Sequence, residues 1–207
     1  MKNTSALLIV DLQNDFLSGG ALAVPHGDRI IPHINQLIPH FKPIITTQDW
    51  HPPGHISFAS SHEGKQVGDC VETSYGKQIL WPNHCLQESV GAECSPLLIL
   101  PSSVKQIHKG YHKDFDSYSG FFDSNRQTTG LHEYLSMKAV QHLFVVGLAT
   151  EYCVLATVLD ACQLGYQVKV IQNACEGIET HLNDVSSAWQ TMEDAGAQLT
   201  TTQNVLK

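Results

Sequence analysis

The 207-residue chain lacks several features that mark specialised classes of protein. It carries 12 Lys and Arg residues against 20 Asp and Glu residues, a formal net charge of −8, so nucleic acid and anionic membranes are poor partners for it. No apolar run approaches the roughly 20 residues that a membrane-spanning helix needs. No Cys-x-x-Cys pair occurs among its six cysteines, which argues against a zinc ribbon or a thioredoxin-like site.

The N-terminal segment also lacks the apolar region of a signal peptide, because an acidic residue, Asp11, comes too early. We therefore expect a cytoplasmic protein with reduced thiols. Hydrophobic residues make up 42% of the chain and charged residues 15%, which excludes an intrinsically disordered chain. No repeat, low-complexity tract or linker divides the sequence, so we expect one domain over residues 1–207.

Short apolar runs alternate with segments of helical spacing along most of the chain. Strands are predicted at 6–10, 43–47, 104–108, 142–147, 166–171 and 197–201, and helices at 28–41, from 128 or 129 to 138, at 151–164 and at 180–195. Two segments, about 50–96 and 110–125, have no such period, and long irregular segments in a compact domain are usually functional. The pattern predicts an α/β fold with three layers, α/β/α, around a parallel sheet of about six strands.

Reactive or metal-binding side chains follow four of the predicted strands. They are Asp11 after the first strand, Asp49 and His51 after the second, Lys109 after the third, and Cys153 shortly after the fourth. In an open parallel sheet, ligands bind in the crevice beyond the carboxyl ends of the strands. The sequence therefore predicts that these side chains meet in one site.

Cys153 lies where a strand passes into a helix, in the segment VVGLATEYCV. The first turn of a helix favours the thiolate, and its backbone amides can hold an oxyanion. Asp11 can take the thiol proton, and Lys109 can stabilise the resulting charges. Each residue also has an ordinary interpretation: a small buried hydrophobe for Cys153, a helix cap or solvated strand end for Asp11, and a surface charge for Lys109. Cys162 and Cys175 are better explained as core or bystander thiols.

Asp49-x-His51, followed by His84 in WPNHC, forms a candidate metal site. Alternate residues of an extended segment share a face, so Asp49 and His51 point the same way. One carboxylate and two imidazoles suit Zn²⁺, Fe²⁺ or Mn²⁺ and leave positions open for water or substrate. His55 is a further candidate ligand of lower rank, and His62 ranks lower still. The alternative interpretation is a polar loop rich in histidine.

Five motifs in the same order resemble those of the nicotinamidases, which belong to the isochorismatase-like cysteine hydrolases. The motifs are LLIVDLQNDF around Asp11, TTQDWHPPGHISF around Asp49, WPNHC around His84, HKG around Lys109 and VVGLATEYCV around Cys153, and together they span nearly the whole chain. The Asp-x-His pair with WPNHC favours nicotinamidases over the isochorismatases and N-carbamoylsarcosine amidases, which generally lack that metal set.

The resemblance implies a role for each matching residue. Asp11, Lys109 and Cys153 match the catalytic triad, and Asp49, His51 and His84 match the ligands of one divalent metal, with Zn²⁺ preferred over Fe²⁺ or Mn²⁺ and His55 left in doubt. The metal then binds the pyridine nitrogen of nicotinamide. Phe16, Trp81 and Tyr118 match the aromatic residues around the ring, and the backbone N–H groups of Ala149 and Cys153 match the oxyanion hole, beside a cis peptide expected between Leu148 and Ala149.

The activity implied is hydrolysis of nicotinamide to nicotinate and ammonia through a thioester on Cys153, with pyrazinamide as a side substrate and a role in recycling nicotinamide toward NAD. The partner is a small molecule rather than nucleic acid or membrane, and a homo-oligomer is possible. Three alternatives stay open: another isochorismatase-like or carbamoyl-amide hydrolase, a catalytically silent binding protein of the same fold, and a histidine-rich metal-storage protein.

Overall fold

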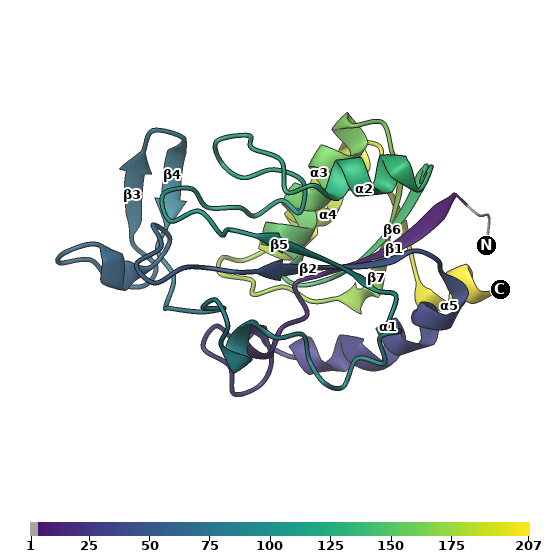
Figure 1. Cartoon of the computed structure of the whole chain (residues 1–207), viewed down its shortest axis with the longest axis horizontal. Helices are drawn as coiled ribbons and strands as arrows, with labels where there is room; N and C mark the ends of the chain where they lie inside the picture. The colour runs from purple at the N-terminus through teal and green to yellow at the C-terminus, as the bar shows by residue number, and fades with distance from the viewer. Residues whose placement is uncertain (1–3) are drawn as a thin grey trace.

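The computed structural model describes residues 4–207 and contains a six-stranded sheet (Figure 1). Its strands are β1 (Ser5–Val10), β2 (Ile44–Asp49), β5 (Lys105–Lys109), β6 (His142–Gly147), β7 (Gln167–Cys175) and β8 (Gln198–Thr200). They lie in the order β5-β2-β1-β6-β7-β8, and every neighbouring pair is parallel. The predicted α/β fold with a parallel sheet of about six strands is confirmed.

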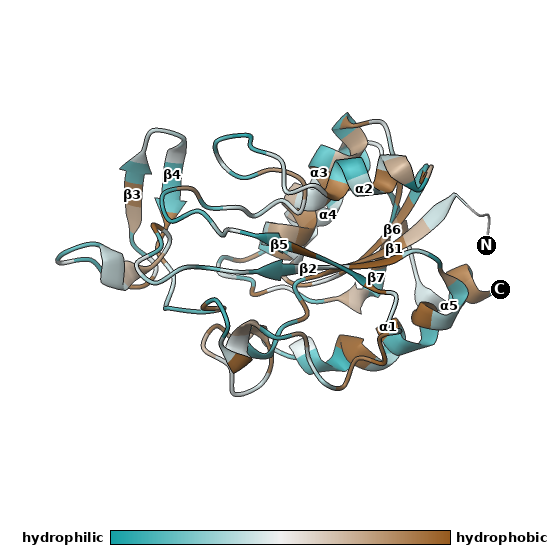
Figure 2. Cartoon of the chain, in the orientation of Figure 1, coloured by the Kyte–Doolittle hydropathy of each residue, from teal (hydrophilic) through white to brown (hydrophobic). Residues whose placement is uncertain are grey.

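Helices cover both faces of the sheet. On one face α1 (Ile31–Leu37) and α5 (Thr202–Leu206) pack into the apolar cluster that includes Leu7 and Ile9 of β1. On the other face α2 (Leu131–Met137), α3 (Leu155–Gln163) and α4 (Asp184–Asp194) pack into the apolar cluster that includes Leu8 of β1. Because alternate side chains of a strand point to opposite faces and both faces are covered, β1 is buried throughout and apolar from Ala6 to Val10. Figure 2 shows the central strands β1 and β6 as strongly hydrophobic.

Several predicted elements differ from the structure at their ends. The helix predicted at 28–41 is an α-helix only over Ile31–Leu37, with one tight turn before it and another, Ile38–His40, after it. Pro39 lacks the N–H that a continuing α-helix would use. The helix predicted at 180–195 begins only at Asp184, and the helix predicted from 151 starts with a wide π-type turn over Thr150–Val154. The short helix α5 was not predicted.

The irregular segment after β2 contains a hairpin that the periodicity did not indicate. Strands β3 (Cys70–Thr73) and β4 (Gly76–Ile79) pair with each other and form a separate two-stranded sheet. Figure 1 shows this hairpin at the end of the molecule opposite the two termini. Its residues are mostly exposed, so it has little of the apolar alternation by which half-buried strands are recognised.

The strand order reverses direction at the centre of the sheet. From β1 the chain moves outward to β2 and β5 on one side and later to β6, β7 and β8 on the other. Such a switch point opens a crevice at the carboxyl ends of the strands, where β1 leads into Asp11 and β6 leads toward Cys153. Within residues 4–207, no helix is long and apolar enough to cross a lipid bilayer.

A substitution in the central strand tests this core. Leu8 is fully buried, so Leu8→Ala should lower the free energy of unfolding by about 2–5 kcal/mol, because it removes packed methyl groups and leaves a cavity. The measurement is the midpoint of denaturant unfolding. Met137 at the end of α2 is 76% exposed, and Met137→Ala should change the same free energy by about 0.5 kcal/mol or less. Equal losses in the two variants would contradict the assigned core.

Candidate active site

The centre of the site is the ammonium group of Lys109, the last residue of β5. Its Nζ lies 3.0 Å from Asp11 Oδ2 and 2.5 Å from Asp49 Oδ1. It also donates hydrogen bonds to the Ser117 carbonyl oxygen at 2.8 Å and to Cys153 Sγ at 3.3 Å. The Lys109 side chain is fully buried, so these contacts replace its hydration completely. The structure therefore brings together the three residues predicted as a triad, along with Asp49.

The parallel register places two of these groups side by side. Asp49 is paired with Lys109 between β2 and β5, so both side chains leave the sheet on the same face. Gln13 holds the backbone of Asp49: its side-chain oxygen accepts the Asp49 N–H at 2.8 Å, and its side-chain nitrogen donates to the Asp49 carbonyl at 2.8 Å. The strand end that carries Asp49 is thus fixed before any ligand binds.

Asp11 follows β1 in a left-handed backbone conformation, with φ of 47°, which aspartate tolerates better than most residues. Thr47 of β2 donates its hydroxyl hydrogen to Asp11 Oδ1 at 2.7 Å. Asp11 Oδ2 forms the ion pair with Lys109, and within residues 4–207 it has no hydrogen-bond partner besides this ion pair. One oxygen of this buried carboxylate is therefore anchored, and the other is left to face the reacting groups.

Cys153 lies in the wide turn Thr150–Val154, between β6 and α3, and is buried. The expected cis peptide is present between Leu148 and Ala149. Ala149 immediately precedes the turn and lines the same pocket as Cys153. Cys162, half-buried in α3, and Cys175, buried at the end of β7, line no part of that pocket.

Burial and charge set the proton affinities of the four central groups. Burial raises the pKa of the Cys153 thiol well above its usual value, against the opposing effect of Lys109. Burial also raises the pKa of Asp11, more than Lys109 lowers it. Burial would raise the pKa of Asp49, but Lys109 and His51 outweigh it and hold that pKa well below its usual value.

The pKa of Lys109 is likewise decided by competition. Burial would lower it, but the carboxylates of Asp11 and Asp49 outweigh burial and raise it well above its usual value. At neutral pH the site therefore holds an ammonium, an anionic Asp49 and a neutral thiol. Asp11, with its raised pKa, is the group best suited to exchange a proton with Cys153.

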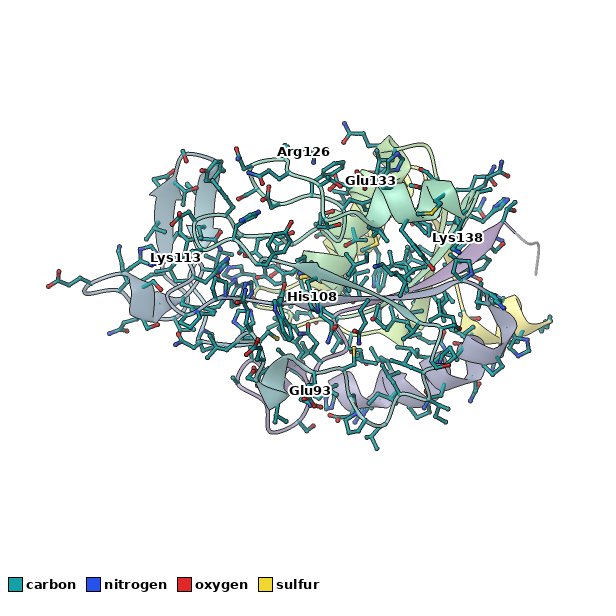
Figure 3. All side chains as sticks on the ribbon, in the orientation of Figure 1. Glu93, His108, Lys113, Arg126, Glu133 and Lys138 are labelled. Carbon is teal, nitrogen blue, oxygen red and sulfur yellow. The ribbon has the colours of Figure 1, made fainter. Side chains whose placement is uncertain are left out.

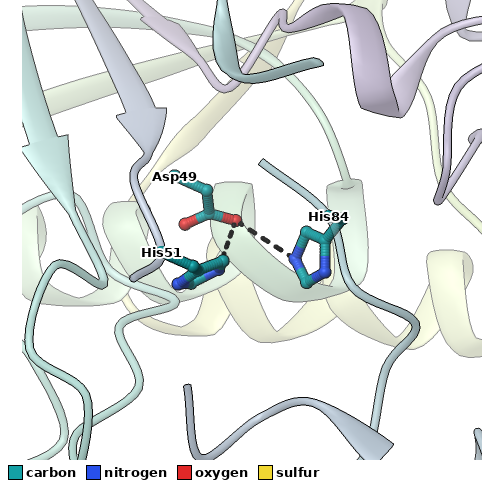
Figure 4. A group of neighbouring side chains, drawn as sticks. All are labelled: Asp49, His51 and His84. Atoms are coloured by element: carbon teal, nitrogen blue, oxygen red, sulfur yellow. Dashed lines mark ion pairs between the residues drawn. The ribbon is translucent and has the colours of Figure 1, made fainter. Parts of the chain in front are cut away.

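The other oxygen of Asp49 faces two imidazoles (Figure 4). Asp49 Oδ2 lies 3.6 Å from His51 Nε2 and 3.8 Å from His84 Nε2. The opposite ring nitrogen of each histidine donates to a backbone carbonyl: His51 Nδ1 to Gly110 at 2.9 Å and His84 Nδ1 to Pro82 at 2.8 Å. In the neutral rings the lone pairs therefore lie on the Nε2 atoms that face Asp49.

This donor set fits a divalent metal. The three donor atoms lie within 4.8 Å of one another, and all three residues are buried. Backbone acceptors of this kind commonly orient histidines that ligate metals. Gly110 allows the close approach, because a Cβ at that position would lie 2.5 Å from His51 Cε1. The geometry supports Asp49, His51 and His84 as a metal site.

His55 lies outside this group of donors. Its ring stacks on that of His51 with centroids 4.1 Å apart. Its Nδ1 lies 2.7 Å from the Ser57 hydroxyl, and its Nε2 lies 3.3 Å from the Phe115 carbonyl oxygen. Burial, together with His51, lowers the pKa of His55 to about 4. His55 falls instead in a second group of donor atoms with His51 and Asp116, and His62 falls in none of the groups found among the described residues.

A single pocket joins the candidate metal site to the thiol. Its lining includes the three predicted aromatic residues, Phe16, Trp81 and Tyr118, and also Asp49, His51, His84, Ala149 and Cys153. Trp81 donates its indole N–H to the Tyr118 hydroxyl oxygen at 3.0 Å, which fixes two of the aromatic walls. The pocket thus has an apolar body with a few polar groups, among them a metal-type donor set and a thiol, and small-molecule sites are usually mostly apolar with a few polar groups.

The pocket also contains residues that were not predicted from the sequence: Leu22, Val24, Asp116, Tyr152 and Ile178. The signal that could have found Tyr152 is its place next to Cys153 in the sequence. The other four lie in segments without regular structure or periodicity. No local pattern indicates that such residues approach the strand ends.

In contrast to the buried Lys109, the charged residues labelled in Figure 3, such as Lys113, Arg126 and Lys138, are exposed.

Removal of the central ammonium should be costly. Lys109→Met leaves two buried carboxylates without their partner and should lower the free energy of unfolding by about 3–5 kcal/mol at neutral pH. The deficit should shrink as pH falls, because protonation of Asp11 and Asp49 removes the uncompensated charges. Chemical denaturation at several pH values measures both effects. Lys105→Met, at an exposed position of the same strand, is the control, and an equal loss there would contradict the prediction.

Comparisons with known proteins agree with this geometry. The Isochorismatase domain family matches residues 5–204. A nicotinamidase from Acinetobacter baylyi is 46% identical over 205 residues, which cover 99% of this chain and 95% of that protein.

Two solved structures extend the comparison. A structure described as a nicotinamidase and pyrazinamidase from Acinetobacter baumanii is 44% identical, with a TM-score of 0.95 and 99% of each chain covered. A pyrazinamidase of Pyrococcus horikoshii in complex with zinc is 37% identical, with a TM-score of 0.80, 96% of this chain and 99% of that chain covered. On the family match and on these identities over nearly its full length, the chain belongs to the isochorismatase family of hydrolases, and these relatives within it are named as nicotinamidases and pyrazinamidases.

Proposed function

We propose that this protein is a nicotinamidase, which hydrolyses nicotinamide to nicotinate and ammonia, with pyrazinamide as a second substrate. The observation that carries the proposal is that Asp11 and Lys109 meet Cys153, which lines a pocket together with Asp49, His51 and His84. The names of its relatives support the choice of amide. In this role the protein returns nicotinamide toward NAD as nicotinate.

In the first half of the reaction, Asp11 takes the proton of the Cys153 thiol while the sulfur attacks the carboxamide carbon. Because burial keeps the thiol neutral, proton transfer must accompany attack. Lys109, within 3.3 Å of the sulfur and 3.0 Å of Asp11, stabilises the negative charge on either group. The carbonyl oxygen becomes an oxyanion held by the N–H groups of Ala149 and Cys153. Collapse breaks the carbon–nitrogen bond, and Asp11 gives its proton to the departing ammonia.

In the second half a water molecule attacks the thioester carbon and gives a proton to Asp11. The tetrahedral intermediate again places its oxyanion on the Ala149 and Cys153 amides. The carbon–sulfur bond then breaks, the sulfur takes the proton back from Asp11, and the product leaves as the acid, which loses its proton to water to give nicotinate. Asp11 thus moves one proton each way in both halves, a use that fits its raised pKa.

The pocket walls orient the substrate. Phe16, Trp81 and Tyr118 supply aromatic surface for a flat ring. We propose that Asp49, His51 and His84 hold one divalent metal ion, Zn²⁺ in preference to Fe²⁺ or Mn²⁺, with His55 outside the ligand set. When bound, the metal supplies a Lewis-acid contact for a ring nitrogen. The zinc in the Pyrococcus horikoshii pyrazinamidase supports the choice of ion.

A pair of cysteine variants tests the nucleophile. Cys153→Ala should lower the rate of ammonia release from nicotinamide by at least about 10³-fold, because Cys153 supplies the thiol that lines the pocket. Cys162→Ala should keep the wild-type rate within about 2-fold, since Cys162 lies outside the pocket. The assay is ammonia release by purified protein, with pyrazinamide as a second substrate. Comparable losses in both variants would refute the assignment, and an inactive, folded, metal-loaded wild type would refute the choice of substrate.

The metal assignment has its own test. His84→Ala should lower metal affinity by more than about 10-fold, because it removes one of three protein ligands. Metal analysis of the purified protein after dialysis against a weak chelator provides the measurement. His62→Ala is the matched control, since His62 lies in the same irregular segment and its ring donates a hydrogen bond to the Ile56 carbonyl oxygen. Full retention of metal by His84→Ala would remove His84 from the ligand set.

A further inference from the structure

The turn that carries Cys153 also holds a neighbouring loop. Residues 176–180 lie between the end of β7 at Cys175 and the start of α4 at Asp184. Thr150 donates its backbone N–H to the Glu176 carbonyl oxygen at 2.9 Å. Two residues later, the Tyr152 hydroxyl lies 3.2 Å from the Thr180 hydroxyl. Between these two contacts, the side chain of Glu151 reaches into the loop itself.

The Glu151 carboxylate binds the loop backbone. Its Oε1 accepts two successive N–H groups, that of Ile178 at 2.8 Å and that of Glu179 at 2.6 Å. The second oxygen, Oε2, lies against Gly177, where an added Cβ would be only 2.5 Å away. Hydrogen bonds to a carboxylate are roughly twice as strong as those between neutral groups. Glu151 therefore fixes the backbone on both sides of Ile178.

Ile178 is the residue of this loop that lines the substrate pocket. It packs, partly buried, against the apolar cluster that contains Phe16, Val24 and Ala149. Tyr152 lines the same pocket and packs against the same cluster. One wall of the pocket is thus built from the nucleophile turn and from a loop without secondary structure, and the Glu151 carboxylate joins the two.

We propose that Glu151 is a positioning residue that holds Ile178 as a wall for the substrate ring. The inference rests on the proposed function, because it assigns the wall to a flat heteroaromatic amide. Glu151 is absent from the pocket lining, so it acts through Ile178 and not on the reacting atoms. Its loss should weaken ring binding more than it slows bond cleavage, because the contacts of Ile178 with the ring do not change between substrate and transition state.

Kinetics of three variants test this role. Glu151→Ala should raise KM for nicotinamide by about 10-fold while kcat stays within about 3-fold of wild type. Glu151→Gln should fall between wild type and Glu151→Ala, because its side-chain oxygen can still accept the two N–H groups. Glu193→Ala, at an exposed glutamate of α4, should match wild type. An unchanged KM in Glu151→Ala, or a loss confined to kcat, would overturn the proposal.

A double-mutant cycle separates positioning from general destabilisation. If Glu151 acts through Ile178, the double variant Glu151→Ala/Ile178→Ala should raise KM no more than the worse of the two single variants. If the rise in KM of the double variant equals the product of the rises in the two single variants, the residues act independently, and the proposal is overturned.

Hydrogen exchange of residues 176–183 provides a measurement that does not depend on the substrate. Faster exchange there in Glu151→Ala than in Glu193→Ala supports the positioning role, and equal exchange contradicts it. If the wild type fails to hydrolyse nicotinamide, the proposed function fails, while the exchange result still decides whether Glu151 holds the loop.

Discussion

The ammonium group of Lys109 is fully buried between Asp11 and Asp49, and the rest of the site is arranged around it. A buried ammonium is stable only with charged partners and hydrogen-bond acceptors, and here two carboxylates, a carbonyl oxygen and a sulfur supply them. The same constraint works in reverse, because the ammonium of Lys109 favours the ionised form of both carboxylates. Charge balance, and not packing alone, fixes where these side chains lie.

Asp49 links the two halves of the site. One of its oxygens meets Lys109 and through it the Asp11–Cys153 pair, while the other faces His51 and His84. A change in charge on the histidine side therefore acts on the triad through a single carboxylate. This connection gives a physical reason for the proposed metal ligands and the Cys153 thiol to share one small pocket, because Asp49 balances charge on both sides.

The parallel sheet allows a chain of modest size to bring these side chains together. Its switch point brings the ends of β1, β2, β5 and β6 together, so four side chains reach one crevice from rigid elements. The irregular segments then close the crevice. Trp81 and His84 come from the segment after β2, Tyr118 from the segment after β5, and Ile178 from the segment after β7. Rigid strands place the charged groups, and loops supply the apolar walls.

The sequence alone determined the fold class, and it predicted that candidate reactive side chains lie close to the ends of strands. Local information was sufficient for these, since apolar runs such as 142–147 mark buried strands and Asp11, Asp49 and Lys109 directly end or follow such runs. The tertiary structure alone decided which oxygen of Asp49 faces which partner, where His55 lies, and that Glu151 and Ile178 belong to the neighbourhood of the pocket. The physical reason is that these features depend on contacts between segments far apart in the chain, and no period or spacing within one segment reports such contacts.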